Sequence, residues 1–328
     1  MILQPATPLS PTSPPAGQDS RPSAVVFAYH NVGVRCLNVL LAHRVKVALV
    51  LTHEDNPTEQ IWFDSVARTA ADYTIPTITP ENPSAPEVMQ RIRQLNPDFL
   101  FSFYYRKMLT PELLTIAPRG ALNMHGSLLP RYRGRAPVNW AIIHGETETG
   151  ATLHYMVAKP DAGDIVGQTA VPILPDDTAR NVLDKVTFAA ELTLHRALPA
   201  LLAGNAPRIA QNLRQGSYFS GRKPEDGRID WTGSAVGIHN LVRAVAPPYP
   251  GAFTKIAGQP ARILRTRVIA ANAVLMPAPL LELSDGRLVA HCGGGGALHV
   301  LALEIAGEPT APVALAHRLG PGPWRLGD

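Results

Sequence analysis

Apolar runs and amphipathic stretches alternate along the first two-thirds of the chain. Ser23–His30 and Asp98–Tyr104 are continuous apolar runs, a pattern typical of strands that are buried on both faces. Apolar residues recur at helical spacing between Val34 and Leu41, and Val45–Thr52 is a further apolar run. A strand, a helix and a second strand in this order predict a parallel sheet.

The same alternation continues to residue 204. Helices are predicted at 62–73, 86–95, 137–144 and 178–203, with a short one that begins at Pro111. Further strands are predicted at 75–78, around Asn123 and His125, at 151–157 and at 165–173. The last of these follows its neighbour after a short connection, so it is predicted to be antiparallel. The order of elements indicates an α/β domain with a mostly parallel sheet and helices on both faces.

The pattern changes after residue 204. Residues 205–230 are polar and are interpreted as a linker, and a helix is predicted at 234–246. Short strands separated by glycine-rich turns predict a small barrel, with strands at 252–256, 261–269, 280–283, 287–291 and 297–303. The expected organisation is a proline-rich disordered tail at 1–23, a catalytic domain at 24–204, the linker, and a barrel domain at 231–328.

Composition narrows the class of protein. Apolar residues make up 45% of the chain and charged residues 17%, as in ordinary globular proteins. No apolar run reaches the length of about 18 residues that a membrane span needs, and the first residues lack the basic start of a signal peptide. Cys36 and Cys292 lie too far apart to suggest a disulfide framework. We therefore expect a cytoplasmic protein with no membrane partner. The net charge of +4 is weak evidence for nucleic acid.

The sharpest candidate site is the pair Asn123 and His125. The two residues are two positions apart in a predicted strand, so their side chains share one face, and Gly126 then interrupts the strand. Open α/β sheets build their sites at such strand ends. An amide donor beside an imidazole suits a carbonyl that becomes an oxyanion. A strand-end asparagine that caps backbone beside a surface histidine is an equally good interpretation of the spacing alone.

Other candidates are weaker when each is taken alone. Asp161 lies in a turn-rich stretch where aspartate is usually a turn former. Arg131, Arg133 and Arg135 alternate in a loop that could hold a carboxylate or phosphate, or could simply be solvated. His154, like His144, is more typical of packing or surface positions. The chain has neither an HExxH nor a CxxC pattern, so no metal is expected, and without a GxGxxG no NAD is expected.

Together these motifs resemble the folate-dependent formyltransferases. The resemblance is carried by Asn123–Pro130 (Asn-Met-His-Gly-Ser-Leu-Leu-Pro), by Tyr132–Pro137, and by Asp161–Gly163. It implies a Rossmann-like catalytic domain with Asn123, His125 and Asp161 as catalytic residues, an OB-like C-terminal barrel, and 10-formyltetrahydrofolate as cosubstrate. Asn123 would stabilise the oxyanion and His125 would polarise the formyl group, while Asp161 would either tune His125 or relay the proton that leaves the amine.

The resemblance also implies binding residues. The folate is expected to contact the following residues: Lys107, Met108, Leu109, Arg135, Val157, Ala158, Lys159 and Pro160. Some members of this family formylate the amine of a sugar nucleotide. The diphosphate of such an acceptor needs cationic partners, for which Arg222 and Arg243 are candidates.

Within the family, the closest likeness is to enzymes that formylate UDP-4-amino-4-deoxy-L-arabinose, a step in the lipid A modification that gives polymyxin resistance. This likeness is carried by Thr52–Pro57, Phe101–Arg106 and 144–150. The fused decarboxylase domain of the well-known member has no counterpart here, so a separate decarboxylase polypeptide is expected. A homo-oligomer is possible. The alternatives are a methionyl-tRNA formyltransferase, a formyltransferase for another nucleotide amino-sugar, and a non-catalytic sugar-nucleotide-binding protein. The acidic stretch 54–60 argues against a tRNA partner, because its carboxylates would repel a phosphate backbone.

Overall fold

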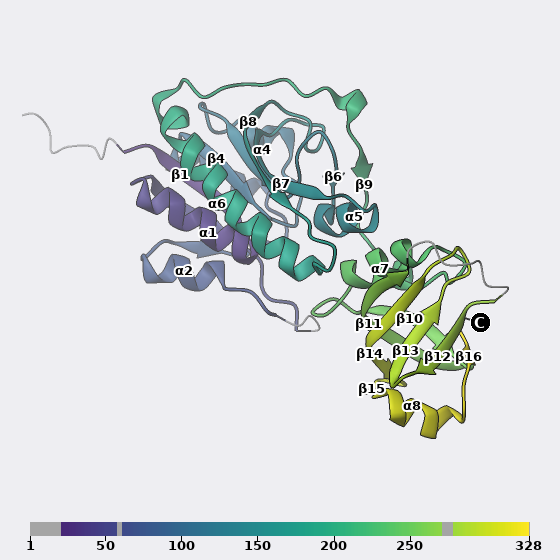
Figure 1. Ribbon diagram of the computed structural model, residues 1–328. Helices are drawn as coiled ribbons and strands as arrows, with labels where there is room; N and C mark the ends of the chain where they lie inside the picture. The colour runs from purple at the N-terminus through teal and green to yellow at the C-terminus, as the bar shows by residue number, and fades with distance from the viewer. Residues whose placement is uncertain (1–20, 58–60, 271–277, 328) are drawn as a thin grey trace, which may run out of the picture.

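The computed structural model of the chain describes residues 21–57, 61–270 and 278–327 (Figure 1). Its N-terminal part is an α/β domain and its C-terminal part is an antiparallel barrel, joined through helix α7 (Ala235–Ala244). Of the tail predicted at 1–23, residues 1–20 lie outside the described residues, and so does the end of the acidic stretch, at 58–60. Ser23, the last residue of the predicted tail, already belongs to the first strand.

The N-terminal domain is built on a sheet whose strand order is β3-β2-β1-β4-β5-β7-β8. Strands β1 to β5 pair in parallel, and β7 is antiparallel to β5. Strand β8 is antiparallel to β7, as predicted. The strands are β1 (Ser23–Ala28), β2 (Lys46–Leu51), β3 (Thr77–Ile78), β4 (Phe99–Phe103), β5 (Ala121–His125), β7 (Glu148–Tyr155) and β8 (Ile165–Pro172). The strand order reverses between β1 and β4, at the point where sheets of this kind form ligand crevices.

Helices cover both faces of this sheet, as expected from strands that are apolar on both sides. Along β1, Val26 packs into one core and Phe27 into the other, because successive side chains of a strand point to opposite faces. The first core is formed with α1 (His30–Ala42), α2 (Val66–Asp72), α5 (Pro137–Ile143) and α6 (Ala179–Ala203). The second core is formed with α3 (Pro86–Leu95) and α4 (Pro111–Leu114).

The first strand is shorter than predicted. The run to His30 was expected to be strand throughout, but β1 ends at Ala28 and His30 begins α1 with a left-handed φ of 65°. The imidazole of His30 packs against the ring of Phe63, with 4.2 Å between centroids, and against Trp62. The reversal of the chain at the strand end therefore overrides the apolar pattern.

Burial of His30 makes the stability of the fold depend on pH. Burial, followed by the charges of Arg106 and Arg180, lowers the pKa of His30 from 6.5 to about 4. Below pH 6.5 the unfolded chain therefore takes up a proton that the folded chain refuses until about pH 4, so folding weakens as pH falls through this window. We expect this histidine to lower the free energy of unfolding by about 2 kcal/mol between pH 7.5 and pH 5.

Urea unfolding at the two pH values checks this expectation. His30→Asn removes the titrating group and keeps a residue that tolerates a left-handed backbone, so its unfolding free energy should change less between the two pH values than that of the wild type. The exposed His317, replaced in the same way, is the matched control. An equal loss in wild type and His30→Asn would contradict the prediction.

The C-terminal domain is a barrel-like sheet in the order β10-β11-β14-β13-β12-β16, which confirms the predicted strands. Its strands are β10 (Ala252–Ile256), β11 (Gln259–Ala270), β12 (Leu280–Ser284), β13 (Arg287–His291), β14 (Ala297–Ile305), β15 (Glu308–Pro309) and β16 (Trp324–Arg325). A bridge between Ile256 and Leu326 brings the two ends of the sheet together. Helix α8 (Pro312–Leu319), which was not predicted, places Leu315 in this core.

Helix α7 joins the two domains. On one side it packs on β11, and on the other Asn139 of α5 donates to the Ala244 carbonyl at 2.8 Å. Residues 205–230 contain η1 (Leu213–Gln215), β9 (Tyr218–Phe219) and η2 (Pro224–Gly227), and β9 pairs in parallel with β6 (Arg133–Gly134). Figure 1 shows this stretch crossing the N-terminal domain before it reaches α7.

Candidate active site

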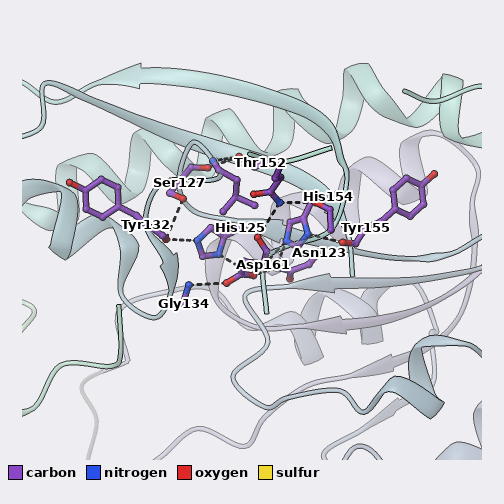
Figure 2. A network of polar contacts seen from close by, with 12 residues as sticks. Asn123, His125, Ser127, Tyr132, Gly134, Thr152, His154, Tyr155 and Asp161 are labelled. Atoms are coloured by element: carbon purple, nitrogen blue, oxygen red, sulfur yellow. Dashed lines mark hydrogen bonds and ion pairs between the residues drawn. The ribbon is translucent and has the colours of Figure 1, made fainter. Parts of the chain in front are cut away.

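Asn123, His125 and Asp161 meet at the end of β5. The Asn123 amide nitrogen lies 3.4 Å from Oδ1 of Asp161, and Nδ1 of His125 lies 3.6 Å from the same oxygen. Figure 2 shows the three side chains converging, while the rings of Tyr132 and Tyr155 point away from them. The strand places the first two residues on one face, and the loop after β7 brings in the aspartate. The structure therefore groups the three residues that were predicted as catalytic.

The orientation of His125 is fixed by backbone. Its Nε2 lies 2.8 Å from the carbonyl oxygen of Tyr132, so Nε2 must carry a hydrogen and donate it. The same loop is closed by Ser127, whose hydroxyl donates to the Arg131 carbonyl at 2.6 Å. His125 is only 6% exposed. The nitrogen that remains for proton exchange is therefore Nδ1, on the side of Asp161.

His154 belongs to the same cluster, and it is buried, as predicted for a packing residue. It lies directly across from Asn123 in the β5–β7 ladder, and its Nε2 is 3.2 Å from the Asn123 amide nitrogen. Its Nδ1 donates to the Tyr155 carbonyl at 2.9 Å, so Nε2 is the acceptor in the neutral ring. This pairing fixes which way the Asn123 amide points. Sequence reasoning missed His154 because the register of an antiparallel pair is not visible along the chain.

Asp161 is held as a carboxylate. Its Oδ2 accepts the backbone N–H of Gly134 at 2.9 Å, and its own backbone is left-handed, with a φ of 51°. Burial alone would raise the pKa of Asp161, but His125, His154 and the Gly134 amide outweigh it and hold that pKa well below its usual range. The carboxylate is therefore ionised throughout the neutral range and can accept or direct a proton.

Residues 209–219 hydrogen-bond to both loops of this site, the one that follows β5 and the one that follows β7. Gln211 donates to the carbonyls of Asp161 and Gly163 at 3.0 and 2.6 Å, which anchors the loop after β7. Ser217 accepts the N–H of Tyr132 at 2.8 Å through its hydroxyl and the N–H of Arg133 at 3.0 Å through its carbonyl. The stretch interpreted from its polarity as a linker therefore also supports the catalytic loops.

The three loop arginines have different surroundings. Arg131 pairs with Glu146, which also accepts the Tyr132 hydroxyl at 2.7 Å. Arg133 is buried, and its Nε has no hydrogen-bond partner among the described residues. Arg135 lies beside Gly221, where an added Cβ would come within 3.5 Å of its side chain. A solvated basic loop therefore does not describe all three residues.

The residues predicted to contact folate fall into two groups. Met108 and Val157 are exposed apolar side chains, at 68% and 47%, and apolar side chains in such positions can pack against a flat ring. Lys107 instead gives its ammonium group to the carbonyls of Pro80 and Glu81, and Leu109 packs against the second core. The remaining predicted contacts on the loop before Asp161 are exposed at Ala158 and Lys159 and half-buried at Pro160.

The two predicted phosphate ligands also differ. Arg222 lies over the Trp140 ring, 4.8 Å from its centroid, and donates to the Asp226 carbonyl at 2.7 Å. Arg243 is buried in α7 and donates to the Leu174 and Asp177 carbonyls at 3.2 and 3.0 Å. Arg243 therefore stabilises the contact between the two domains, and its role at a diphosphate stays a prediction.

Among the described residues no cluster of three or more His, Cys, Asp or Glu side chains is placed to hold a metal ion. Within the same residues, no helix combines the length and the apolar character that crossing a bilayer requires.

The fold and this site define a class of enzyme, a doubly wound α/β transferase whose Asn–His–Asp cluster suits acyl transfer to an amine. Two models of known protein families match the chain. Residues 34–198 match the formyl transferase model, and residues 222–316 match the model of the formyl transferase C-terminal domain. The chain belongs to the formyl transferase family and is a formyltransferase.

Solved structures share this fold across both domains. The N-formyltransferase from Helicobacter canadensis, crystallised with folinic acid and dTDP-3-aminofucose, is 20% identical, with a TM-score of 0.68 over 85% of this chain and 98% of that one. WlaRD, a sugar 3N-formyl transferase, is 20% identical, with a TM-score of 0.67 over 88% and 98%. HypX from Aquifex aeolicus is 17% identical, with a TM-score of 0.61 over 93% of this chain and 49% of that chain.

Proposed function

We propose that the protein transfers the formyl group of 10-formyltetrahydrofolate to the 4-amino group of UDP-4-amino-4-deoxy-L-arabinose. The observation that carries the transfer step is the contact of Asn123 and His125 with one carboxylate oxygen of Asp161. Solved proteins of the same fold were crystallised with folate derivatives and with dTDP-3-aminofucose or dTDP, which supports a folate donor and a nucleotide-sugar acceptor.

The residues of the site suit a formyl donor. The cosubstrate supplies an activated formyl group on nitrogen. The exposed side chains of Met108 and Val157 offer the folate apolar surface at the edge of the site. Arg135 offers a cation for the carboxylates of the folate's glutamate portion. Lys107 is committed to backbone carbonyls and is better described as a support of this loop.

In the proposed mechanism, each residue acts on a separate atom. The Asn123 amide donates to the formyl oxygen as charge develops there, in place of one of its present contacts with His154 and Asp161. The acceptor amine forms the new C–N bond, the old C–N bond to the donor breaks, and the proton released by the amine passes to the departing nitrogen. His125 Nδ1 and the Asp161 carboxylate lie where they can carry that proton.

The choice of acceptor rests on the surroundings of the site. The described part of the acidic stretch, Glu54 and Asp55, lines a cavity at the ends of β1 and β2, a position that is unfavourable for an RNA backbone. The stretches Thr52–Pro57 and Phe101–Arg106, which resemble those of the amino-arabinose enzymes, meet there: the rings of His53 and Tyr105 stack with centroids 4.2 Å apart. A cytoplasmic location and a separate decarboxylase in the same pathway stay predictions.

A direct assay separates the candidate acceptors. The protein is incubated with 10-formyltetrahydrofolate and, in separate reactions, with UDP-4-amino-4-deoxy-L-arabinose, with dTDP-3-aminofucose and with methionyl-tRNA, and formylated products are measured by mass spectrometry. We expect turnover of the UDP-sugar to exceed that of the other two by at least tenfold. Formylation of methionyl-tRNA alone would overturn the proposal, and a preference for the dTDP-sugar would retain formyl transfer and correct the acceptor.

A further inference from the structure

The cavity that Glu54 and Asp55 line lies along the same edge of the sheet as the candidate active site. It has a volume of about 260 Å³ and opens where β1, β2 and β3 end, with Tyr29, His53 and Thr79 in its wall. The registers pair Ala28 with Phe103 and Phe103 with Met124. One residue further on, Tyr29 and His125 therefore stand in one row along the carboxyl edge of the sheet.

The spacing of strands sets the distance between the two sites. Strands in a sheet lie about 4.8 Å apart, so β1 is about 10 Å and β2 about 14 Å from β5. A nucleoside diphosphate sugar is an elongated molecule with its sugar at one end and its base at the other. With its amine at His125, such a molecule lying along the edge would carry its nucleoside to the cavity.

The chemistry of the cavity suits a neutral, flat and hydroxylated group. The rings of His53 and Phe63 both lie 5.1 Å from the Tyr29 ring, which gives the cavity aromatic walls. Burial, together with Lys107 and Arg106, lowers the pKa of His53 to about 4, so this ring is uncharged at neutral pH. Its Nε2 accepts the Arg106 N–H at 3.0 Å, which leaves Nδ1 as the ring's donor.

Carboxylates complete the wall. Asp55 accepts the Tyr29 hydroxyl at 2.8 Å, and Glu54 accepts the Thr79 hydroxyl at 3.1 Å. Asp64 also lines the cavity, and its carboxylate has no hydrogen bond or ion pair among the described residues. These charges would repel a phosphate, whereas a carboxylate is a suitable acceptor for a ribose hydroxyl.

We propose that this cavity binds the ribonucleoside end of the acceptor, with Asp64 accepting its 2′-hydroxyl. The diphosphate would then lie between the cavity and His125, on the side of Arg106, whose guanidinium lies 4.7 Å from the centroid of the Tyr29 ring. This inference rests on the proposed function for the identity of the ligand and adds the place that distinguishes one nucleotide from another.

A pair of matched substitutions tests the cavity. Ala67 lines it on α2, whereas Ala71 is exposed on the same helix and does not. Binding of UDP is measured by calorimetry without any formyl donor. We expect Ala67→Leu to weaken UDP binding by at least tenfold and Ala71→Leu to leave it within twofold of the wild type. Wild-type affinity in a folded Ala67→Leu protein would overturn the proposal.

The role of Asp64 has its own readout, at an exposed position where folding is not at risk. Wild type is expected to bind UDP about tenfold more tightly than dUDP, which lacks only the 2′-hydroxyl, and Asp64→Asn is expected to lose most of that preference. The exposed Glu308→Gln is the control. An unchanged preference in Asp64→Asn would overturn this part of the proposal.

Failure of the cavity and failure of the proposed function give different results. If the protein formylates a UDP-sugar while Ala67→Leu binds UDP normally, the nucleoside lies elsewhere and the proposed function stands. If no sugar nucleotide is formylated but UDP binding still depends on Ala67, the cavity is a nucleoside site and the proposed function is wrong.

Discussion

Replacing His125 with alanine is expected to lower the kcat of formyl transfer by about 10²–10⁴-fold, the usual contribution of a positioned acid–base group. The reason is geometric. Nε2 is occupied by the Tyr132 carbonyl, so Nδ1, 3.6 Å from Asp161, is the nitrogen that can exchange a proton at the reacting atoms. Initial rates at saturating donor and acceptor measure the effect.

Two further variants separate a loss of catalysis from a loss of folding. His125→Gln keeps an amide donor for the Tyr132 carbonyl and removes the titratable nitrogen, so it should lose activity as strongly while its unfolding temperature stays nearer to that of the wild type. His317→Ala changes an exposed histidine of α8 and should leave kcat unchanged. Formyl transfer at close to the normal rate by folded His125→Gln would remove His125 from the mechanism.

Asp161→Asn is expected to reduce kcat by a similar factor, about 10²–10⁴-fold. The substitution keeps the shape of the side chain, and asparagine tolerates the left-handed φ of 51° at this position. What it removes is the negative charge that lies 3.6 Å from His125 and 3.5 Å from His154. The loss should therefore appear mainly in kcat, with a smaller change in KM for the acceptor.

Asp285 provides a matched control for this variant. It is also an aspartate with a φ of 51°, in the turn between β12 and β13 of the barrel. Asp285→Asn should retain full activity, which would show that exchange of carboxylate for amide at a left-handed position is harmless in itself. A folded Asp161→Asn enzyme with a normal pH–rate profile and normal kcat would contradict the catalytic role.

The sequence was sufficient for most of the architecture. The period of apolar residues located α3 and strands β10 and β13 at their observed bounds, because their apolar faces are regular. Each of them also begins at or directly after a Pro or Gly, and α3 ends before Asn96. It failed at His30, where a tight reversal ends an apolar run early, and at α8, which contributes only Leu315 as a fully buried side chain.

Only part of the candidate site could be predicted from the sequence. Asn123 and His125 share a face because of local geometry, which the strand period predicts. The grouping with Asp161 came from resemblance, since a turn aspartate carries no distinguishing pattern. His154 and Gln211 could not be found, because their roles depend on strand register and on a polar stretch that folds back over the loops. Likewise, nothing along the chain showed that Arg243 is committed to backbone carbonyls.

The pairing of β9 with β6 has a consequence for how this enzyme could be rearranged by gene fusion. A module cut at Gly204, after the last helix of the α/β domain, would lack Gln211 and Ser217, which hold the two catalytic loops. The smallest portable catalytic unit therefore extends at least through Phe219, and any new partner domain would have to be attached beyond that strand. Recombination at Gly204 would therefore transfer the catalytic residues without the segment that holds their loops in place.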